Sequence, residues 1–298
     1  MSTNWIHSRA WLRYGSRVPA KTAVDGKRRA QARPGDRTQE AYLRLRDMIV
    51  DGLLQPGQRL AHAKLMQLLG VGRMPLRTAL SRLESDGLVV STPNRGAVVA
   101  PVPVASAEEI YTLRYLVEPP LLEASADAIS RTQIARMRER LRAMRATVYD
   151  AAAFAVAHRE FHTIERESFT SPFIDELVLN MYRHLHRHQR TRIARSYAPV
   201  DFLRLDQETV DALAAGDGLR ARRTLEFHLV DAAISFLGEA DENHRPAVLL
   251  AVTRANGMTI EADGDGVVPR PARVRWSVPC PTLPALRTPY LVFEPDGS

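Results

Sequence analysis

The stretch "LLGVGRMPLRTALSRLESDGLVVSTPNRGAVV", residues 68–99, decides the fold of the front of the chain. Leu76, Leu80 and Leu83 recur at the three- and four-residue spacing that places side chains on one face of a helix. Gly87 ends this helix, and two valine-rich runs then flank a Pro-Asn-Arg-Gly turn, which predicts a β-hairpin. The segment "VGRM" predicts a tight turn before this helix.

Two further helices are expected before that turn. From Thr38 onward, apolar residues form one stripe at helical spacing, namely Tyr42, Leu45, Ile49 and Leu53. "LLQPGQRL" then interrupts the helix with proline and glycine, and a short second helix stops at Gly70. Three helices followed by a hairpin predict a winged helix-turn-helix domain over residues 38–102.

The arginines of the third helix suit contact with DNA. Its apolar face holds it to the core, so its arginines can face outward and bind guanine edges or phosphates. The expected contacts are these arginines and the tip of the hairpin: Arg73, Arg77, Arg82, Asn94, Arg95 and Gly96. Arginines on any helix are usually solvated, but the order of turn, arginine-rich helix and Arg-Gly hairpin favours DNA binding.

The excess positive charge lies in the first third of the chain. Residues 1–37 carry nine Lys/Arg and two acidic residues, and residues 38–102 carry eight and five. A basic front on a near-neutral body favours a polyanionic partner for the front alone. Residues 1–37 lack sustained periodicity and are expected to form a basic, disordered tail, which either contacts that partner or is only solvated.

The remaining chain predicts a mainly α-helical protein. Residues 103–238 show the pattern of an antiparallel all-helical bundle, with helices expected at 106–129, 132–147, 151–168, 172–195, 200–215 and 217–237. Residues 239–298 are rich in Pro and Gly and show at most short strands. We therefore expect them to form a flexible or loosely packed extension.

Several features favour a cytoplasmic protein. Cys280 is the single cysteine, so no internal disulfide can form and a reducing compartment is favoured. No apolar run approaches the roughly 20 residues that span a bilayer, and no signal-peptide pattern is present. No membrane partner is expected.

The stretch "AHREFHTIE" places His158 and His162 one helical turn apart. A zinc peptidase helix would carry its glutamate directly after the first histidine, whereas Glu160 lies about 200° around the helix and points away. The pair is therefore either part of a different metal site or two histidines on a wet face or in a satisfied core. A rival pair, His184 and His188, has the same spacing but lies among arginines, which would repel a metal.

The front of the chain resembles the DNA-binding domain of the GntR family of bacterial transcription regulators. "L-x-PG-x-RL", "LGV-x-R-x-P-x-R-x-AL-x-RLE-x-x-GL" and "P-N-RGA-x-V" are present in order and without gaps. The resemblance implies that Arg73, Arg77 and the Arg95–Gly96 turn bind double-stranded operator DNA.

The chain also departs from that family at helix starts. Family members commonly carry hydroxyl residues where this chain has Gly72 and Met74, and those side chains cap the recognition helix and touch phosphate. The usual Ser-Glu opening of the second helix is here Ala61-His62. These departures predict a changed affinity or sequence preference.

The helical half resembles the FCD ligand-binding domain of the FadR-type subfamily, through "YTLRYLVEPPLLEAS" and "DALAAGDGLRARRTLEFHLVDA". Members often hold a divalent metal with one aspartate and three histidines. Laid over this chain, those positions are His158, His162, Asp206 and His228, with the first Asp and the second His exchanged. The ligand composition is preserved and suits zinc, with nickel or manganese as alternatives.

The resemblance also implies a small carboxylate effector beside the metal, with an arginine pairing the rest of its charge. Arg114 matches a frequently retained arginine of the first helix and is the candidate. A salt bridge to Glu118, four residues on, explains Arg114 equally well. Effector binding would change how a homodimer spaces its DNA-binding domains on a symmetric operator.

The sequence thus favours a metabolite-responsive transcription regulator over two alternatives. A metal-dependent hydrolase lacks a suitably placed general base and leaves the DNA-binding front unexplained, so no enzyme activity is expected. A DNA-binding regulator whose sensor domain no longer holds metal or ligand stays open.

Overall fold

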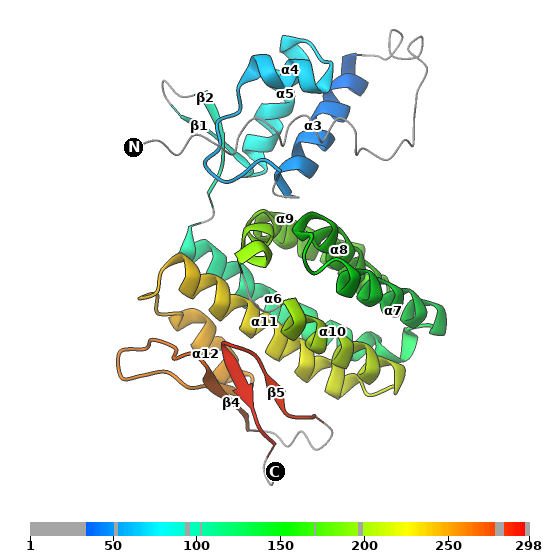
Figure 1. The fold of residues 1–298 in the computed structure, drawn as a ribbon, viewed down its shortest axis with the longest axis vertical. Coiled ribbons are helices and arrows are strands. Elements are labelled where there is room, and N and C mark those ends of the chain that lie inside the picture. The colour runs from blue at the N-terminus through cyan, green and yellow to red at the C-terminus, as the bar shows by residue number, and fades with distance from the viewer. Residues whose placement is uncertain are drawn as a thin grey trace.

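The computed structural model describes residues 34–50, 53–92, 96–101, 103–169, 171–195, 199–277 and 283–295. Figure 1 shows three parts along the long axis, namely a winged-helix domain, a helical bundle and a C-terminal helix-and-sheet cap. Most of the expected tail, residues 1–33, and the hairpin-tip residues Asn94 and Arg95 lie outside the described residues.

The winged-helix domain has the expected order of elements. It consists of α3 (Pro34–Val50), α4 (His62–Leu69), α5 (Arg73–Ser85), β1 (Val89–Thr92) and β2 (Gly96–Val99). Gly70 adopts a left-handed conformation with φ 66°, which ends α4 and starts the turn. Leucines from all three helices and Val99 of the antiparallel hairpin share one buried core. The winged helix-turn-helix prediction is confirmed.

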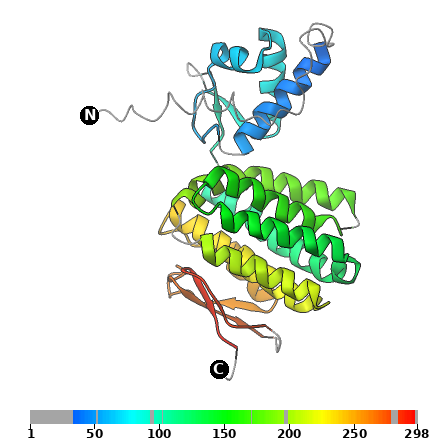
Figure 2. The same ribbon diagram turned by 45° about the vertical axis from the view of Figure 1, so that its right-hand side comes forward.

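The helical bundle follows directly. Its elements are α6 (Val104–Ser125), η1 (Ala126–Ala128), α7 (Arg131–Ala146), α8 (Ala151–Arg166), α9 (Pro172–Arg195), α10 (Pro199–Ala214) and α11 (Gly218–Ala240). α11 packs along α6, α8 packs along α7, and α10 contacts both α11 and α7. Figure 2 shows these helices side by side between the winged-helix domain and the cap. Among the described residues, no helix is long and apolar enough to cross a membrane.

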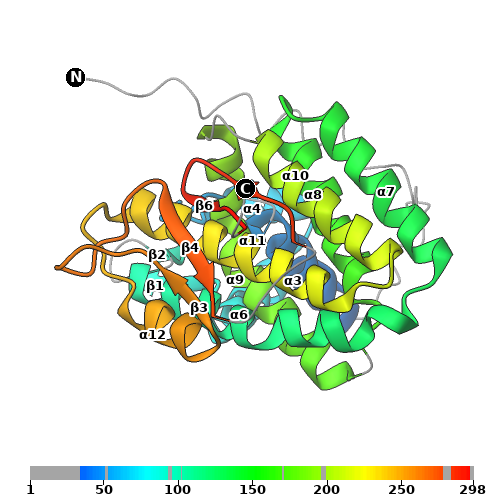
Figure 3. The same ribbon diagram turned by 90° about the horizontal axis from the view of Figure 1, so that it is seen from below.

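The C-terminal cap, residues 247–293, closes one side of the bundle. It contains α12 (Ala247–Ala255), β3 (Met258–Ile260), β4 (Ala272–Trp276), β5 (Leu286–Arg287) and β6 (Leu291–Phe293). The strand order is β3-β4-β6-β5, in which β4 and β6 run parallel and the other pairs antiparallel. Figure 3, seen from below, shows α12 and the strands over α6 and α11.

The folded cap shows that the expectation of a flexible extension was wrong. Val274 and Leu291 of the sheet are buried in the same cluster as Tyr111 of α6 and Phe227 of α11. The strands are two to five residues long, so the sequence offers too little alternation to mark them. The extension lacks a separate core because it uses the apolar face of the bundle.

Buried carboxylates of the bundle also bind the cap. Glu108 of α6 accepts hydrogen bonds from backbone N–H groups in the first turn of α12, at 2.8 and 3.1 Å. On α11, Glu226 accepts from Trp276 at 3.0 Å and Asp231 accepts from the hydroxyl of Thr288. Without the cap, these carboxylates would lose partners that lie far from them in sequence.

Candidate functional site

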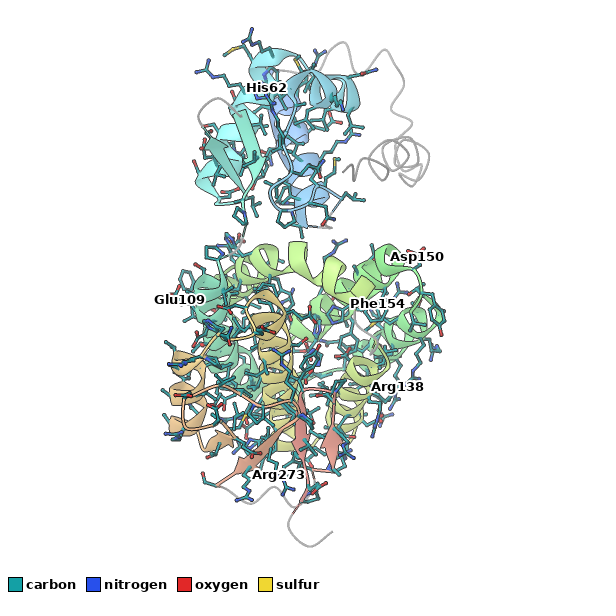
Figure 4. The ribbon with its side chains drawn as sticks, turned by 60° about the vertical axis from the view of Figure 1, so that its left-hand side comes forward. His62, Glu109, Arg138, Asp150, Phe154 and Arg273 are labelled. Carbon is teal, nitrogen blue, oxygen red and sulfur yellow. The ribbon has the colours of Figure 1, made fainter. Side chains whose placement is uncertain are left out.

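The recognition helix α5 presents its arginines to solvent. Arg73 and Arg77 are exposed and lie one turn apart, while Leu76, Leu80 and Leu83 are buried against the domain core. Figure 4 labels His62, at the start of the preceding helix, at the end of the molecule farthest from Arg273 in the cap. The helix-turn-helix therefore lies at a free end of the chain's fold.

Arg82 has a different environment from the other two arginines. It donates a hydrogen bond to Gln39 Oε1 at 2.7 Å, and its guanidinium carbon lies 4.2 Å from the centroid of the Tyr42 ring. Both partners belong to α3, so Arg82 ties the end of α5 to α3. Arg82 itself stays exposed, as Arg73 and Arg77 do.

Neither helix of the motif has a side-chain cap at its start. Ala61 precedes α4 and Gly72 precedes α5, and neither makes a side-chain capping hydrogen bond. Met74, at the start of the recognition helix, is 67% exposed. At the hairpin, Gly96 has a φ of 73°, a left-handed backbone conformation that favours glycine. A Cβ added at this position would have no other atom within 4 Å.

Three histidines from two helices converge inside the bundle. One ring nitrogen each from His158 and His162 of α8 and from His228 of α11 lie within 4.8 Å of one another. The Nε2 atoms of His158 and His162 are 3.1 Å apart, and each of the three residues is at most 6% exposed. Imidazole nitrogens at this spacing can share one divalent ion.

Asp206 of α10 adjoins this cluster through His228. Its Oδ1 lies 3.4 Å from His228 Nδ1, while its Oδ2 is buried and makes no hydrogen bond to any described residue. Burial, with a further contribution from Glu165, raises the pKa of Asp206 well above its usual value. A buried carboxylate oxygen without a partner is costly, so this donor set fits a cation. The four predicted ligands thus lie together, with Asp206 beside the three grouped nitrogens.

Glu165 is a neighbour of the cluster that was not predicted from the sequence. Its Oε2 lies 2.8 Å from His162 Nδ1, and burial raises the pKa of Glu165 to about 7. Burial, reinforced by Arg114 and Arg166, lowers the pKa of His162, which favours the neutral form that binds metals. A carboxylate at Nδ1 leaves Nε2 facing the other histidines. Glu165 lies three residues after His162, a spacing that places both side chains on one helix face, and this spacing could have indicated the contact from the sequence.

Arg114, the predicted ligand-binding residue, is engaged by Glu118. Its Nε and Nη2 donate to the two oxygens of Glu118 at 2.6 and 3.2 Å. Its guanidinium carbon lies 3.9 Å from the centroid of the Tyr182 ring. Although burial opposes the charged form, Glu118 raises the pKa of Arg114. Of the two interpretations of Arg114, the structure therefore contains the salt bridge to Glu118.

Arg166 lies against the same aromatic ring and was not predicted. Its guanidinium carbon is 4.7 Å from the centroid of Tyr182, and only 6% of the residue is exposed. Nε donates weakly to Asp175 at 3.4 Å, whereas the buried Nη1 has no hydrogen bond to any described residue. An arginine in the last turn of a helix is common, so the sequence alone gave no reason to single it out.

His184, one of the rival histidine pair, is not part of the cluster. His184 of α9 is half-buried and faces the winged-helix domain, where its Cε1 would lie 3.3 Å from a Cβ added at Gly87. The side chain of His188 lies outside the described residues.

Comparisons with known proteins agree with both domains. Residues 37–99 match the model of the bacterial regulatory proteins of the gntR family, and residues 109–231 match the FCD domain. The chain is 30% identical over 131 residues to an HTH-type transcriptional regulator of Agrobacterium vitis, covering 42% of this chain and 77% of that relative. It is 28% identical over 200 residues to an HTH-type transcriptional regulator of Streptomyces ambofaciens, covering 67% and 85%.

Solved structures give the same result. A GntR transcriptional regulator from Rhodococcus sp. RHA1 is 30% identical, with a TM-score of 0.60 over 68% of this chain and 98% of that one. E. coli McbR/YncC, 20% identical with a TM-score of 0.61 over the same shares, has the same fold. The FCD match ends at residue 231, before the cap begins. This chain therefore belongs to the GntR family, in the FadR-type branch with an FCD domain, and is a DNA-binding transcription regulator rather than an enzyme.

Proposed function

We propose that this regulator binds a symmetric operator as a homodimer, and that a small organic acid held beside a divalent metal in the bundle alters operator binding. The buried convergence of His158, His162, His228 and Asp206 carries this proposal, because such a set is costly to bury without a cation. Zinc suits three imidazoles and one carboxylate, and nickel or manganese accept the same donors.

The side chains around the cluster would serve metal and effector. Glu165 would orient His162 through Nδ1, as carboxylates commonly do for ligating histidines. When bound, the metal would supply open coordination positions for a carboxylate oxygen. The buried Nη1 of Arg166 is available to pair the remaining negative charge, whereas Arg114 would have to share its contact with Glu118.

The winged-helix domain would read the operator through α5 and the hairpin. Arg73 and Arg77 would contact base edges or phosphates in the major groove, which their exposure on α5 supports. Arg95 and Asn94, with Gly96 beside them, are the proposed contacts of the hairpin tip. We assign Arg82 to holding α5 on α3, because its guanidinium is already bound there.

Helix α9 offers a physical connection between the histidine cluster and the winged-helix domain. The Tyr182 ring lies 5.8 Å from the His162 ring, centroid to centroid, and His184, two residues on, faces Gly87 of the winged-helix domain. α9 also packs against α3. A shift of α9 on metal or effector binding would therefore move the DNA-binding domain, which is the coupling that an allosteric regulator needs.

Metal content measured by mass spectrometry on untagged protein tests the proposal. We expect about one metal per chain in the wild type, loss in His228→Ala, and retention in the control His184→Ala. Protein that stays metal-free after incubation with zinc and nickel would contradict it. The alternative, a DNA-binding regulator whose sensor domain holds neither metal nor ligand, would then stand.

A further inference from the structure

A pocket lies where the cap meets α7 and α10 of the bundle. Its volume is about 280 Å³, and the buried side chains of Leu205 and Leu286 form part of its lining. Three arginines from separate elements surround it, namely Arg145 of α7, Arg204 of α10 and Arg287 of β5. One wall consists of residues 284–287, so the pocket exists only because the cap is folded.

The charges around this pocket are unbalanced. Among its described lining residues Glu208 is the one carboxylate, and Arg220 of α11 already binds it. Arg145 donates to Gln207 at 3.0 Å, which is a neutral partner. Within the part of the chain that the structure describes, neither Arg204 nor Arg287 makes an ion pair.

We propose that this pocket binds a small multiply charged oxyanion, of the class of phosphate, phosphate esters and tricarboxylates. Guanidinium groups bind such oxyanions through paired, charge-assisted hydrogen bonds. The three guanidiniums are exposed, and together they carry more positive charge than a monoanion would neutralise, which favours a ligand with more than one negative charge. The volume of about 280 Å³ lies just below the usual range of about 300–1,000 Å³ for small-molecule sites, which favours a compact ligand.

The bound anion would fasten the cap to the bundle. Arg204 and Arg287 come from α10 and β5, so one anion that contacts both joins two parts far apart in sequence. The next residue, Thr288, already donates to Asp231 of α11. Arg204 lies two residues before Asp206, about 200° around the helix, so the pocket and the histidine cluster lie on different faces of α10. The two sites share no ligand-binding side chain.

Titration of inorganic phosphate into the full-length protein by calorimetry, at ionic strength held constant with chloride, tests the proposal. We expect saturable binding at one site per chain. Arg204→Gln and Arg287→Gln should each weaken it about tenfold or more, because each removes a charge-assisted contact. Arg142→Gln removes the same charge from the exposed face of α7, one turn from the pocket, and should leave binding within about twofold.

Two results would overturn the inference. One is the absence of saturable binding for both phosphate and pyrophosphate. The other is an equal loss in Arg142→Gln, because that would indicate general attraction to a basic surface. The variants must keep the wild-type circular dichroism spectrum and melting temperature in chloride; Arg287→Lys, which keeps the charge, should retain more binding than Arg287→Gln. Binding should persist in His228→Ala, so failure of the metal proposal and failure of this one can be told apart.

Discussion

Trp276 of β4 and Glu226 of α11 are joined by a hydrogen bond of 3.0 Å, from the indole Nε1 to a carboxylate oxygen. Glu226 is 1% exposed and also accepts from Arg222 and Arg223 of its own helix. A buried charge of the bundle is thus shared between its own arginines and the cap. We therefore expect the cap to unfold together with the bundle and not as an appendage.

Trp276→Phe tests that statement. The substitution keeps an aromatic ring but removes the donor to a buried carboxylate, so we expect the free energy of unfolding to fall by about 1–3 kcal/mol. Chemical denaturation followed by circular dichroism measures it. Arg275→Gln, an exposed change on the same strand, is the control. An equal effect of both variants would contradict a specific role for the hydrogen bond.

Metal affinity should depend on the carboxylate behind His162. Glu165→Gln keeps the size of the side chain but removes its charge, and should weaken metal binding about 10- to 100-fold. Competition with a chelator of known affinity provides the measurement. Glu160→Gln, on the same helix but exposed and paired with Arg140, should leave the affinity unchanged. If the two variants behave alike, Glu165 has no orienting role.

The arginines of α5 should separate into two groups. Arg73→Ala and Arg77→Ala should each weaken operator binding by about 1–3 kcal/mol, and a lost phosphate contact should lower the salt slope by about one. Fluorescence anisotropy across a range of salt concentrations, on an operator selected from random DNA, measures both quantities. Arg82→Ala should instead lower the melting temperature, because it breaks the contact with Gln39 and Tyr42. Strong loss of binding by Arg82→Ala at unchanged stability would refute this division.

The uncapped start of α4 can be improved. Ala61 has an extended backbone, φ −70° and ψ 113°, from which a serine hydroxyl can accept a hydrogen bond from the first turn. Ala61→Ser should raise the free energy of unfolding of the winged-helix domain by about 1 kcal/mol. Gln67→Ser, which places the same side chain inside the helix, should lower it. Thermal unfolding of the pair gives the comparison, and a serine at position 61 that fails to stabilise would reject the capping argument.

Periodicity and family motifs predicted most of the fold and the residues of the histidine cluster. The predicted helix 172–195 has the same bounds as α9, and the overlay of the FCD pattern selected histidines that the fold brings together. Side-chain contacts between residues distant in sequence could not be predicted. Nothing in the spacing of Arg82 reveals that Gln39, 43 residues earlier, accepts its hydrogen bond. The choice between ligand and salt bridge for Arg114 likewise depended on side-chain geometry that only the structure supplies.

The cap escaped prediction for a related reason. Its strands are too short to show a period, and its apolar residues find their partners on α6 and α11. A segment that packs on the core of another domain has too few apolar residues in a regular pattern to predict its own fold.

The position of the cap also restricts how subunits can assemble. A two-fold interface needs the same free patch on both copies, and the cap has used the apolar face of α6 and α11 that it covers for contacts within the chain. A homodimer interface formed by the bundle must therefore use a different surface of the bundle. Because the C-terminal segment packs on α6 and α11 of its own chain, a second subunit is unable to dock on that face.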